Sequence, residues 1–140
     1  RGGSITPLLA LLGVMNSLTF EFQLRAYLAT GHVSLSSLRK VTVPTVDCLT
    51  REYVLAELVQ RALQAEDEEG CLIDAYVAKN LYGLTEEEYA CVLGGFSKIE
   101  ADERSRYLDS YGRVDSIVAD DFGRTTYSLL QKSATLPCTA

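Results

Sequence analysis

Apolar residues recur every three or four positions along much of the chain, which is the spacing of amphipathic α-helices. The first such stretch, residues 8–27, is expected to form a helix that Gly13 kinks or divides, because glycine has low helix propensity. Thr30-Gly31 is expected to end it. The same pattern predicts further helices over residues 54–63, 72–81, 89–96 and 100–111, and a short one over 124–131 ahead of frayed residues 133–140.

Polar residues and glycines mark the expected helix ends. Thr50 is placed to cap the helix over 54–63, and the acidic run 66–70 is expected to end that helix as a solvated turn. Gly83 is expected to stop the next helix with a positive φ. Thr85 stands three residues before Glu88, so the two side chains can satisfy each other's backbone N–H groups in a capping box.

A different pattern occupies residues 33–46, where apolar and mostly β-branched residues stand among serine, threonine and basic residues. This composition predicts one or two short strands, which Pro44 confines to a sheet edge or a turn. We therefore expect a mainly α fold with a small β element (α+β), made of five to six helices and two to three short strands. The apolar positions of the expected β element are Val33, Leu35, Val41, Val43 and Val46.

With 140 residues, 47% of them apolar, the chain can bury one core, so residues 1–140 are expected to form a single domain or domain fragment. Residues 1–47 form its helix, loop and strand part, and residues 48–140 its helical part. The longest apolar run, residues 7–15, is shorter than the roughly 20 residues of a membrane span. The four cysteines show no close pairing. A cytoplasmic protein with reduced thiols and no membrane partner is expected.

The net charge of −6 is unevenly distributed along the chain. Residues 1–50 carry a net charge of +2, whereas residues 51–140 carry a net charge of −8. Because affinity for duplex DNA depends largely on Lys and Arg near phosphates, any contact with nucleic acid is expected in the first third.

No catalytic constellation is evident. His32 is the only histidine, so a Cys-His hydrolase is a remote possibility and a zinc set is not expected. The acidic runs 66–69 and 86–88 are explained as a solvated turn and as first-turn helix acids, without acid/base or metal chemistry. Gly94-Gly95 lacks the Lys-Ser/Thr of a phosphate-binding loop. No catalytic, cofactor-binding or metal-binding residue is therefore assigned.

The segment 30–43 places hydroxyl and basic groups among small residues. Such groups contact phosphates and base edges in protein–DNA interfaces, although the composition alone also fits an ordinary polar loop. The candidate DNA-contact residues in this segment are His32, Ser34, Ser36, Ser37, Arg39 and Lys40.

Two regions of the chain resemble the C-terminal part of large bacterial restriction-modification methyltransferases, the single-chain adenine-specific type and their phage-defence relatives. In the first region a helix with Asn-Ser-x-x-Phe and a distal Arg leads into a Gly-x-His loop and a segment closing on Val-Pro. In the second, an Asp and an apolar helix run into Leu-Tyr-Gly-Leu-Thr-Glu-Glu-Glu, followed by an apolar stretch and Phe. The first region carries Asn16, Ser17, Phe20, Arg25, Gly31, His32, Val41, Val43 and Pro44. The second carries Asp74, Ala75, Val77, Leu81, Tyr82, Gly83, Leu84, Thr85, Glu86, Glu87, Glu88, Tyr89, Val92, Leu93 and Phe96.

The resemblance covers roughly residues 8–100. It departs from the family at Val33-Ser34, where Leu-Asn is common, and at Ser36-Ser37, where aromatic residues are common. It implies a parent enzyme that transfers a methyl group from S-adenosylmethionine to adenine N6, with or without a nuclease, and it adds Arg25 to the DNA-contact candidates. The Asn-Pro-Pro-Tyr and Asp-Pro-Pro-Tyr motifs of catalysis are absent from these 140 residues, as are a Gly-rich cofactor loop and a nuclease motif.

Two interpretations remain open. The chain either contributes to DNA target recognition or packs against the catalytic methyltransferase domain as a non-catalytic C-terminal part of the parent. Alternatively, it is an acidic helical module for protein–protein interaction or structural support, without DNA contact.

Overall fold

The computed structural model describes residues 5–28, 33–64 and 68–121, and the side chains of these residues except 68, 69 and 117–121. The described residues are mainly α-helical, with eight helices, six of them at least seven residues long, and without a strand. The expectation of a mainly α fold is confirmed. The elements are α1 (Thr6–Met15), α2 (Leu18–Ala26), α3 (Leu35–Leu38), α4 (Val46–Thr50), α5 (Tyr53–Gln64), α6 (Glu68–Tyr76), the π-helical η1 (Val77–Leu81), α7 (Glu86–Gly94) and α8 (Ala101–Asp121).

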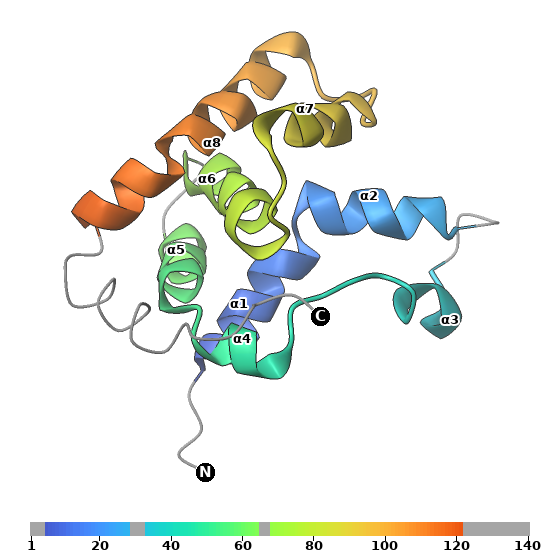
Figure 1. The fold of residues 1–140 in the computed structure, drawn as a ribbon, viewed down its shortest axis with the longest axis horizontal. Helices are drawn as coiled ribbons and strands as arrows, with labels where there is room; N and C mark the ends of the chain where they lie inside the picture. Colours follow the sequence, from blue (N-terminus) through green and yellow to red (C-terminus); the bar gives the residue numbers. More distant parts are fainter. Residues whose placement is uncertain (1–4, 29–32, 65–67, 122–140) are drawn as a thin grey trace.

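The helices pack in an order that brings distant parts of the sequence together (Figure 1). α1 packs against α4 and α5, and α6 packs against both α5 and α8. α2 and α7 contact each other. α3 lies at the periphery, beyond the end of α2. The core contains buried side chains from Ala10 to Val114, and Leu55, Leu58 and Tyr89 are among the largest of them.

The single helix expected over residues 8–27 is instead two helices, bent by 58° relative to each other. The break lies at Asn16-Ser17, where the Ser17 side chain accepts a hydrogen bond from the Phe20 N–H and caps α2. Gly13 does not divide the helix. A Cβ at Gly13 would lie 3.0 Å from side-chain atoms of Leu55 and Val59, so this glycine allows α1 to approach α5 closely.

The predicted β element over residues 33–46 is wrong for the described residues, which form α3 and α4 there. Ser34 caps α3 by accepting from the Ser37 N–H at 3.1 Å, and Thr45 caps α4 by accepting from the Cys48 N–H at 3.2 Å. These local caps satisfy backbone donors that a strand would have to pair with a neighbouring strand. The β-branched residues Val41 and Val43 lie between these two capped helices, in a connection that is neither helix nor strand.

Two further boundaries differ from expectation. Thr50 does not cap α5; it ends α4, and its hydroxyl donates to the Val46 carbonyl at 2.8 Å. The acidic turn expected over 66–70 is helical from Glu68 onward, because α6 begins there. Residues 65–67, Thr30-Gly31, the short helix expected over 124–131 and the tail 133–140 lie outside the described residues.

The boundaries near Gly83 are confirmed. Gly83 has φ +66°, and Thr85 and Glu88 form the capping box at the start of α7. Burial of Tyr89, Val92 and Leu93 then fixes the inward face of α7, which ends at Gly94 as expected.

Among the described residues, no single helix is long and apolar enough to cross a membrane. The bent pair α1 and α2 passes that test of length and composition only when the two helices are taken together.

Candidate functional site

The predicted DNA-contact segment forms the small surface around α3, at the periphery of the molecule (Figure 1). Ser34 and Ser37 have structural roles there. The Ser34 hydroxyl caps α3 and lies 3.1 Å from the Ser37 hydroxyl, and the buried Ser37 side chain also donates to the Tyr27 carbonyl at 3.4 Å. These two serines attach α3 to the end of α2.

The basic residues that follow α3 are exposed. Lys40 Nζ lies 5.7 Å from the centre of the Tyr27 ring, within reach of a cation–π contact. Arg39 and Ser36 are also exposed. The structure thus brings Ser36, Arg39 and Lys40 to one solvent-facing segment of the chain, while His32 lies outside the described residues.

Arg25 does not share this surface, because its contacts lie at α7. Its guanidinium carbon lies 4.5 Å from the centre of the Phe96 ring, and its Nη2 lies 3.6 Å from Glu21 Oε1 one turn earlier in α2. The Phe96 ring is buried. Arg25 therefore joins the α2 helix to the residues that follow α7.

A buried carboxylate that the sequence analysis left without a role lies at the centre of the fold. Asp74 is 5% exposed, and its Oδ1 accepts a 2.7 Å hydrogen bond from the backbone N–H of Leu18 at the start of α2. Its Oδ2 accepts a short hydrogen bond from the hydroxyl of Tyr89 in α7. One side chain of α6 thereby connects three helices.

Burial is the largest influence on the electrostatics of Asp74. Desolvation raises the pKa of its carboxyl to about 6, and the hydrogen bonds from Tyr89 and Leu18 oppose this rise. Burial, followed by the charge of Asp74, raises the pKa of Tyr107 to about 12, and the same two causes raise the pKa of Tyr89. Both tyrosines thus stay protonated near neutral pH, and Tyr89 can donate to Asp74.

A sequence signal for Asp74 did exist. It is the one charged residue within the apolar run 71–78, on a helix whose neighbouring positions Ala75, Tyr76 and Val77 are buried. An acid on a buried helix face requires partners, but the sequence does not indicate that these partners come from α2 and α7.

A second buried carboxylate occupies the segment between α4 and α5. Glu52 is 6% exposed, accepts a 2.8 Å hydrogen bond from the Tyr76 hydroxyl, and lies 4.0 Å from the Cys48 thiol. Burial raises the pKa of Glu52, against the opposing effects of Tyr76 and Arg51. This group links α6 to the α4–α5 segment, as Asp74 links α6 to α2 and α7.

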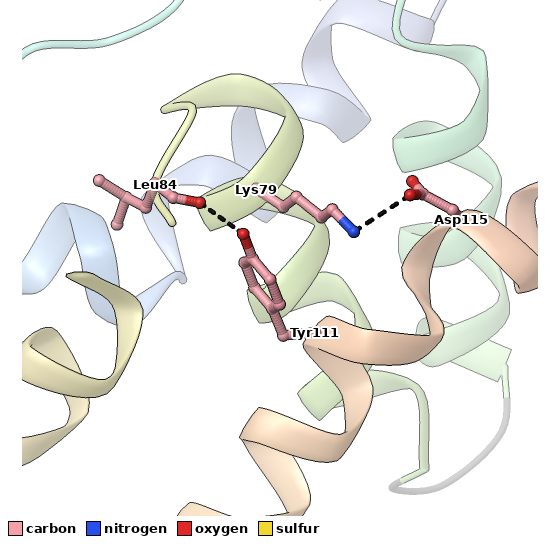
Figure 2. A network of polar contacts seen from close by, with 4 residues as sticks. All are labelled: Lys79, Leu84, Tyr111 and Asp115. Carbon is pink, nitrogen blue, oxygen red and sulfur yellow. Dashed lines mark hydrogen bonds and ion pairs between the residues drawn. The ribbon is translucent and has the colours of Figure 1, made fainter. Parts of the chain in front are cut away.

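The outer face of α6 and η1 is held to α8 by a polar network that Figure 2 shows. Lys79 Nζ lies 3.1 Å from Asp115 Oδ2 and 4.9 Å from the centre of the Tyr111 ring. The Tyr111 hydroxyl donates to the Leu84 carbonyl at 2.7 Å, just beyond the turn at Gly83. These contacts fix the position of α8 relative to the η1–α7 connection.

Two neighbouring depressions open beside these helices. One, of about 260 Å³, is lined by Asp74 and Tyr107 together with residues of the α1–α2 junction. The other, of about 180 Å³, lies between α1 and α5 and is mainly apolar. Its lining residues are Leu12, Gly13, Asn16, Val59, Ala62, Leu63 and Ile73.

An exposed apolar surface borders the second depression and shares Leu12 and Leu63 with it. Ile5, Leu8, Leu12 and Met15 follow a helical spacing along α1 and are 41–68% exposed, and Leu63 at the end of α5 is 67% exposed. Exposed large apolar side chains that are neighbours in a structure are typical of a surface that another protein or domain covers. We call Leu8, Leu12, Met15 and Leu63 the α1 face.

The carboxylates of these sites act as hydrogen-bond acceptors within the fold. The described residues contain no group of three or more His, Cys, Asp or Glu side chains that could hold a metal ion. Burial raises the pKa of the Cys71 thiol, so this cysteine is not activated as a nucleophile. Asp74 and Glu52 each receive hydrogen bonds that hold helices together.

Comparison with protein-family models, curated proteins and solved structures finds no match to this chain.

Proposed function

We propose that the chain is a non-catalytic helical part of a bacterial adenine-specific DNA methyltransferase, or of a restriction enzyme built on one, and that it packs against the catalytic domain. The observation that carries the proposal is the contact between the two regions that resemble this family. Asp74 of the second region accepts a hydrogen bond at Leu18, beside Ser17 of the first. Arg25 of the first region lies over the ring of Phe96 of the second.

Other contacts join the same two regions. The Tyr82 hydroxyl of the second region donates to the Thr42 carbonyl of the first at 2.5 Å, and within the first region the Thr42 N–H donates to Gln23 Oε1 at 3.1 Å. The two regions therefore form one connected unit, which a domain shared with the family would require. Their association supports a shared fold with the family.

The matched residues have roles that stabilise this unit. Ser17 caps α2, Gly83 supplies the positive φ before α7, and Thr85 with Glu88 caps α7. Since these positions maintain helix ends and helix contacts, a scaffold role explains them without catalysis. The methyl donor, S-adenosylmethionine, would bind elsewhere in the parent enzyme.

Packing against the catalytic domain is supported by the α1 face. Burying one leucine fully is worth roughly 1.5–3 kcal/mol, so several such side chains in contact with a partner give a substantial driving force. Within a methyltransferase, the catalytic domain is the neighbour that would cover the α1 face of a non-catalytic part.

DNA target recognition is a second candidate function, favoured by the exposed positions of Ser36, Arg39 and Lys40 around α3. The side chains of Arg39 and Lys40 can neutralise DNA phosphates, while the Ser36 hydroxyl contacts the sugar-phosphate backbone. Of the other predicted contact residues, Ser34 and Ser37 form hydrogen bonds at α3, and Arg25 lies over the Phe96 ring.

The full coding sequence tests the parentage. We expect Asn-Pro-Pro-Tyr or Asp-Pro-Pro-Tyr, with a Gly-rich cofactor loop, in the same reading frame. A full reading frame without these motifs would contradict the methyltransferase proposal and leave an independent helical interaction module.

DNA recognition is tested in the parent enzyme with Arg39→Ala combined with Lys40→Ala. If both cations contact phosphates, the variant binds duplex DNA more weakly. The slope of log affinity against log salt concentration also becomes less steep by about 2. Lys98→Ala with Arg113→Ala is the control, since it removes the same charge from exposed positions outside α3. An unchanged salt slope in the Arg39 and Lys40 variant would contradict DNA contact by this surface.

A further inference from the structure

The two depressions beside α1 and α6 are adjacent, because Asn16 and Ile73 line both of them, and we call the pair the groove. At one end the groove is bordered by Leu12, Val59 and Leu63, and at the other by Asp74 and Tyr107. The apolar end includes two residues of the α1 face. The groove thus extends the surface that we propose to pack against the catalytic domain.

The acidic end of the groove holds a negative charge without a cationic partner. Asp74 receives hydrogen bonds from a backbone N–H and from a tyrosine hydroxyl, and the ion pairs among the described residues do not include it. A carboxylate can accept about four hydrogen bonds, so acceptor capacity remains for an incoming donor.

The other polar groups that line this end are already engaged. Asn16 Nδ2 donates to the Leu12 carbonyl at 2.8 Å, and the Ser17 hydroxyl donates to the Val14 carbonyl at 2.7 Å. These donors satisfy carbonyls at the end of α1 instead of turning toward Asp74. Among the described residues that line this end, neither Asn16 nor Ser17 therefore supplies a donor to Asp74.

Tyr107 adds a second feature that favours a cation. It is half-buried in the lining of the same end, and the negative face of an aromatic ring attracts ammonium and guanidinium groups. A carboxylate and an aromatic ring beside a volume of about 260 Å³ are suited to a lysine or arginine side chain.

We propose that this groove binds a segment of the packing partner that presents a lysine or arginine to Asp74 and Tyr107 and an apolar side chain to the end bordered by Leu12 and Leu63. The identity of the partner as the catalytic domain rests on the proposed function. The expected chemistry of the segment depends only on the residues that line the groove, because they make one end of the groove acidic and the other apolar. An acidic segment would be repelled by Asp74.

The test uses two probes that share a hexyl chain and differ in the head group, the cationic hexylguanidinium and the neutral 1-hexanol, titrated into the ¹⁵N-labelled chain at neutral pH. Hexylguanidinium is expected to shift the amide signals of Leu18, Ile73 and Leu63, and to bind roughly tenfold more tightly than hexanol, as a charge-assisted hydrogen bond in a half-buried site predicts. Asp74→Asn should remove this advantage while leaving hexanol binding intact. Asp109→Asn, which removes an exposed charge from α8, should leave the advantage unchanged.

A variant that keeps Asp74 provides an independent test if Asp74→Asn does not fold. Tyr107→Leu retains an apolar side chain, and it should weaken binding of hexylguanidinium several-fold without weakening that of hexanol. Equal affinity of the two probes, absence of binding by both, or an advantage that persists in the folded Asp74 and Tyr107 variants would overturn the proposal. Each of these results leaves the proposed function standing, because its tests concern the coding sequence and the α1 face rather than charge selectivity in the groove.

Discussion

The backbone N–H of Leu18 donates a 2.7 Å hydrogen bond to Oδ1 of Asp74, which joins the start of α2 to the middle of α6. Because the other carboxylate oxygen accepts from Tyr89, this one side chain connects α2, α6 and α7. The same contact brings together the two sequence regions on which the proposed function rests.

Replacing Asp74 by alanine should therefore destabilise the fold. Asp74→Ala leaves the Leu18 N–H and the Tyr89 hydroxyl without their acceptor, and we expect the free energy of unfolding to fall by about 2 kcal/mol. Urea denaturation at neutral pH measures this change, with Asp109→Ala as the control because Asp109 is exposed on α8. Equal stability of the two variants would contradict the structural role of Asp74.

The pH dependence of stability should report the buried charge of Asp74. The pKa of this carboxyl is about 6 in the folded chain against an ordinary value of 3.8, so the folded state binds the proton more tightly. The stabilisation by protonated Asp74 is then fully present below the unfolded pKa, and it is lost as pH rises through the folded pKa.

Asp74→Asn isolates this effect, because asparagine cannot titrate. Between about pH 7.5 and about pH 4.5, the free energy of unfolding of the unmodified chain should rise by about 2 kcal/mol relative to that of the variant. The titrations of other carboxylates cancel in this comparison to the extent that the variant leaves them unchanged. If the difference in free energy of unfolding between the two proteins stays constant across this range, or changes in the opposite direction, burial does not disfavour the ionised form of Asp74.

Gly83 should tolerate no side chain without a loss of stability. Its φ of +66° disfavours residues with a Cβ, so Gly83→Ala is expected to cost roughly 1 kcal/mol in the free energy of unfolding, although nothing lies within 4 Å of the added methyl. Gly112→Ala is the matched comparison in the interior of α8, also in open space, and should stabilise the chain by about 0.5–1 kcal/mol. Both substitutions add the same methyl group in open space, so opposite stability changes would show that the backbone conformation at Gly83 causes the loss. Thermal denaturation of both variants checks them, and a neutral Gly83→Ala would contradict the left-handed turn.

The capping box at the start of α7 gives a further prediction. Thr85→Ala removes the acceptor for the Glu88 N–H and should lower the free energy of unfolding by about 1 kcal/mol. Thr42→Ala serves as the control, because the contacts of Thr42 with Gln23 and Tyr82 use its backbone. If both variants unfold at the same denaturant concentration, the cap does not contribute to stability.

Local chemistry was sufficient to predict some elements and not others. The cap of α7 and the turn at Gly83 involve residues within a few positions of each other, so their chemistry is visible in the sequence. The residues around α3 and α4 were interpreted as strands because β-branched side chains are common there, but Ser34 and Thr45 cap helical turns. The break between α1 and α2 was assigned to Gly13, whereas contact with α5 explains that glycine.

The candidate site was harder to predict because its contacts are distant in sequence. Arg25 was interpreted as a DNA contact, and the ring that it covers, Phe96, lies far along the chain. Asp74 fitted the helical pattern, and nothing near it in sequence indicates its bond to Leu18. The α1 face was equally hidden, since a leucine that faces a partner has the same spacing as one that faces the core.

The central claim, that the α1 face packs against the catalytic domain of a methyltransferase, is tested most directly by titrating the chain into that domain of the parent enzyme by calorimetry. Leu8→Lys combined with Leu63→Lys should weaken binding at least about tenfold, because both leucines lose apolar contact on association. Leu35→Lys with Val46→Lys makes the same change at exposed apolar positions of α3 and α4 and should leave binding unchanged. Equal affinity of the unmodified chain and the Leu8 and Leu63 variant, or no binding of the unmodified chain, would contradict the account.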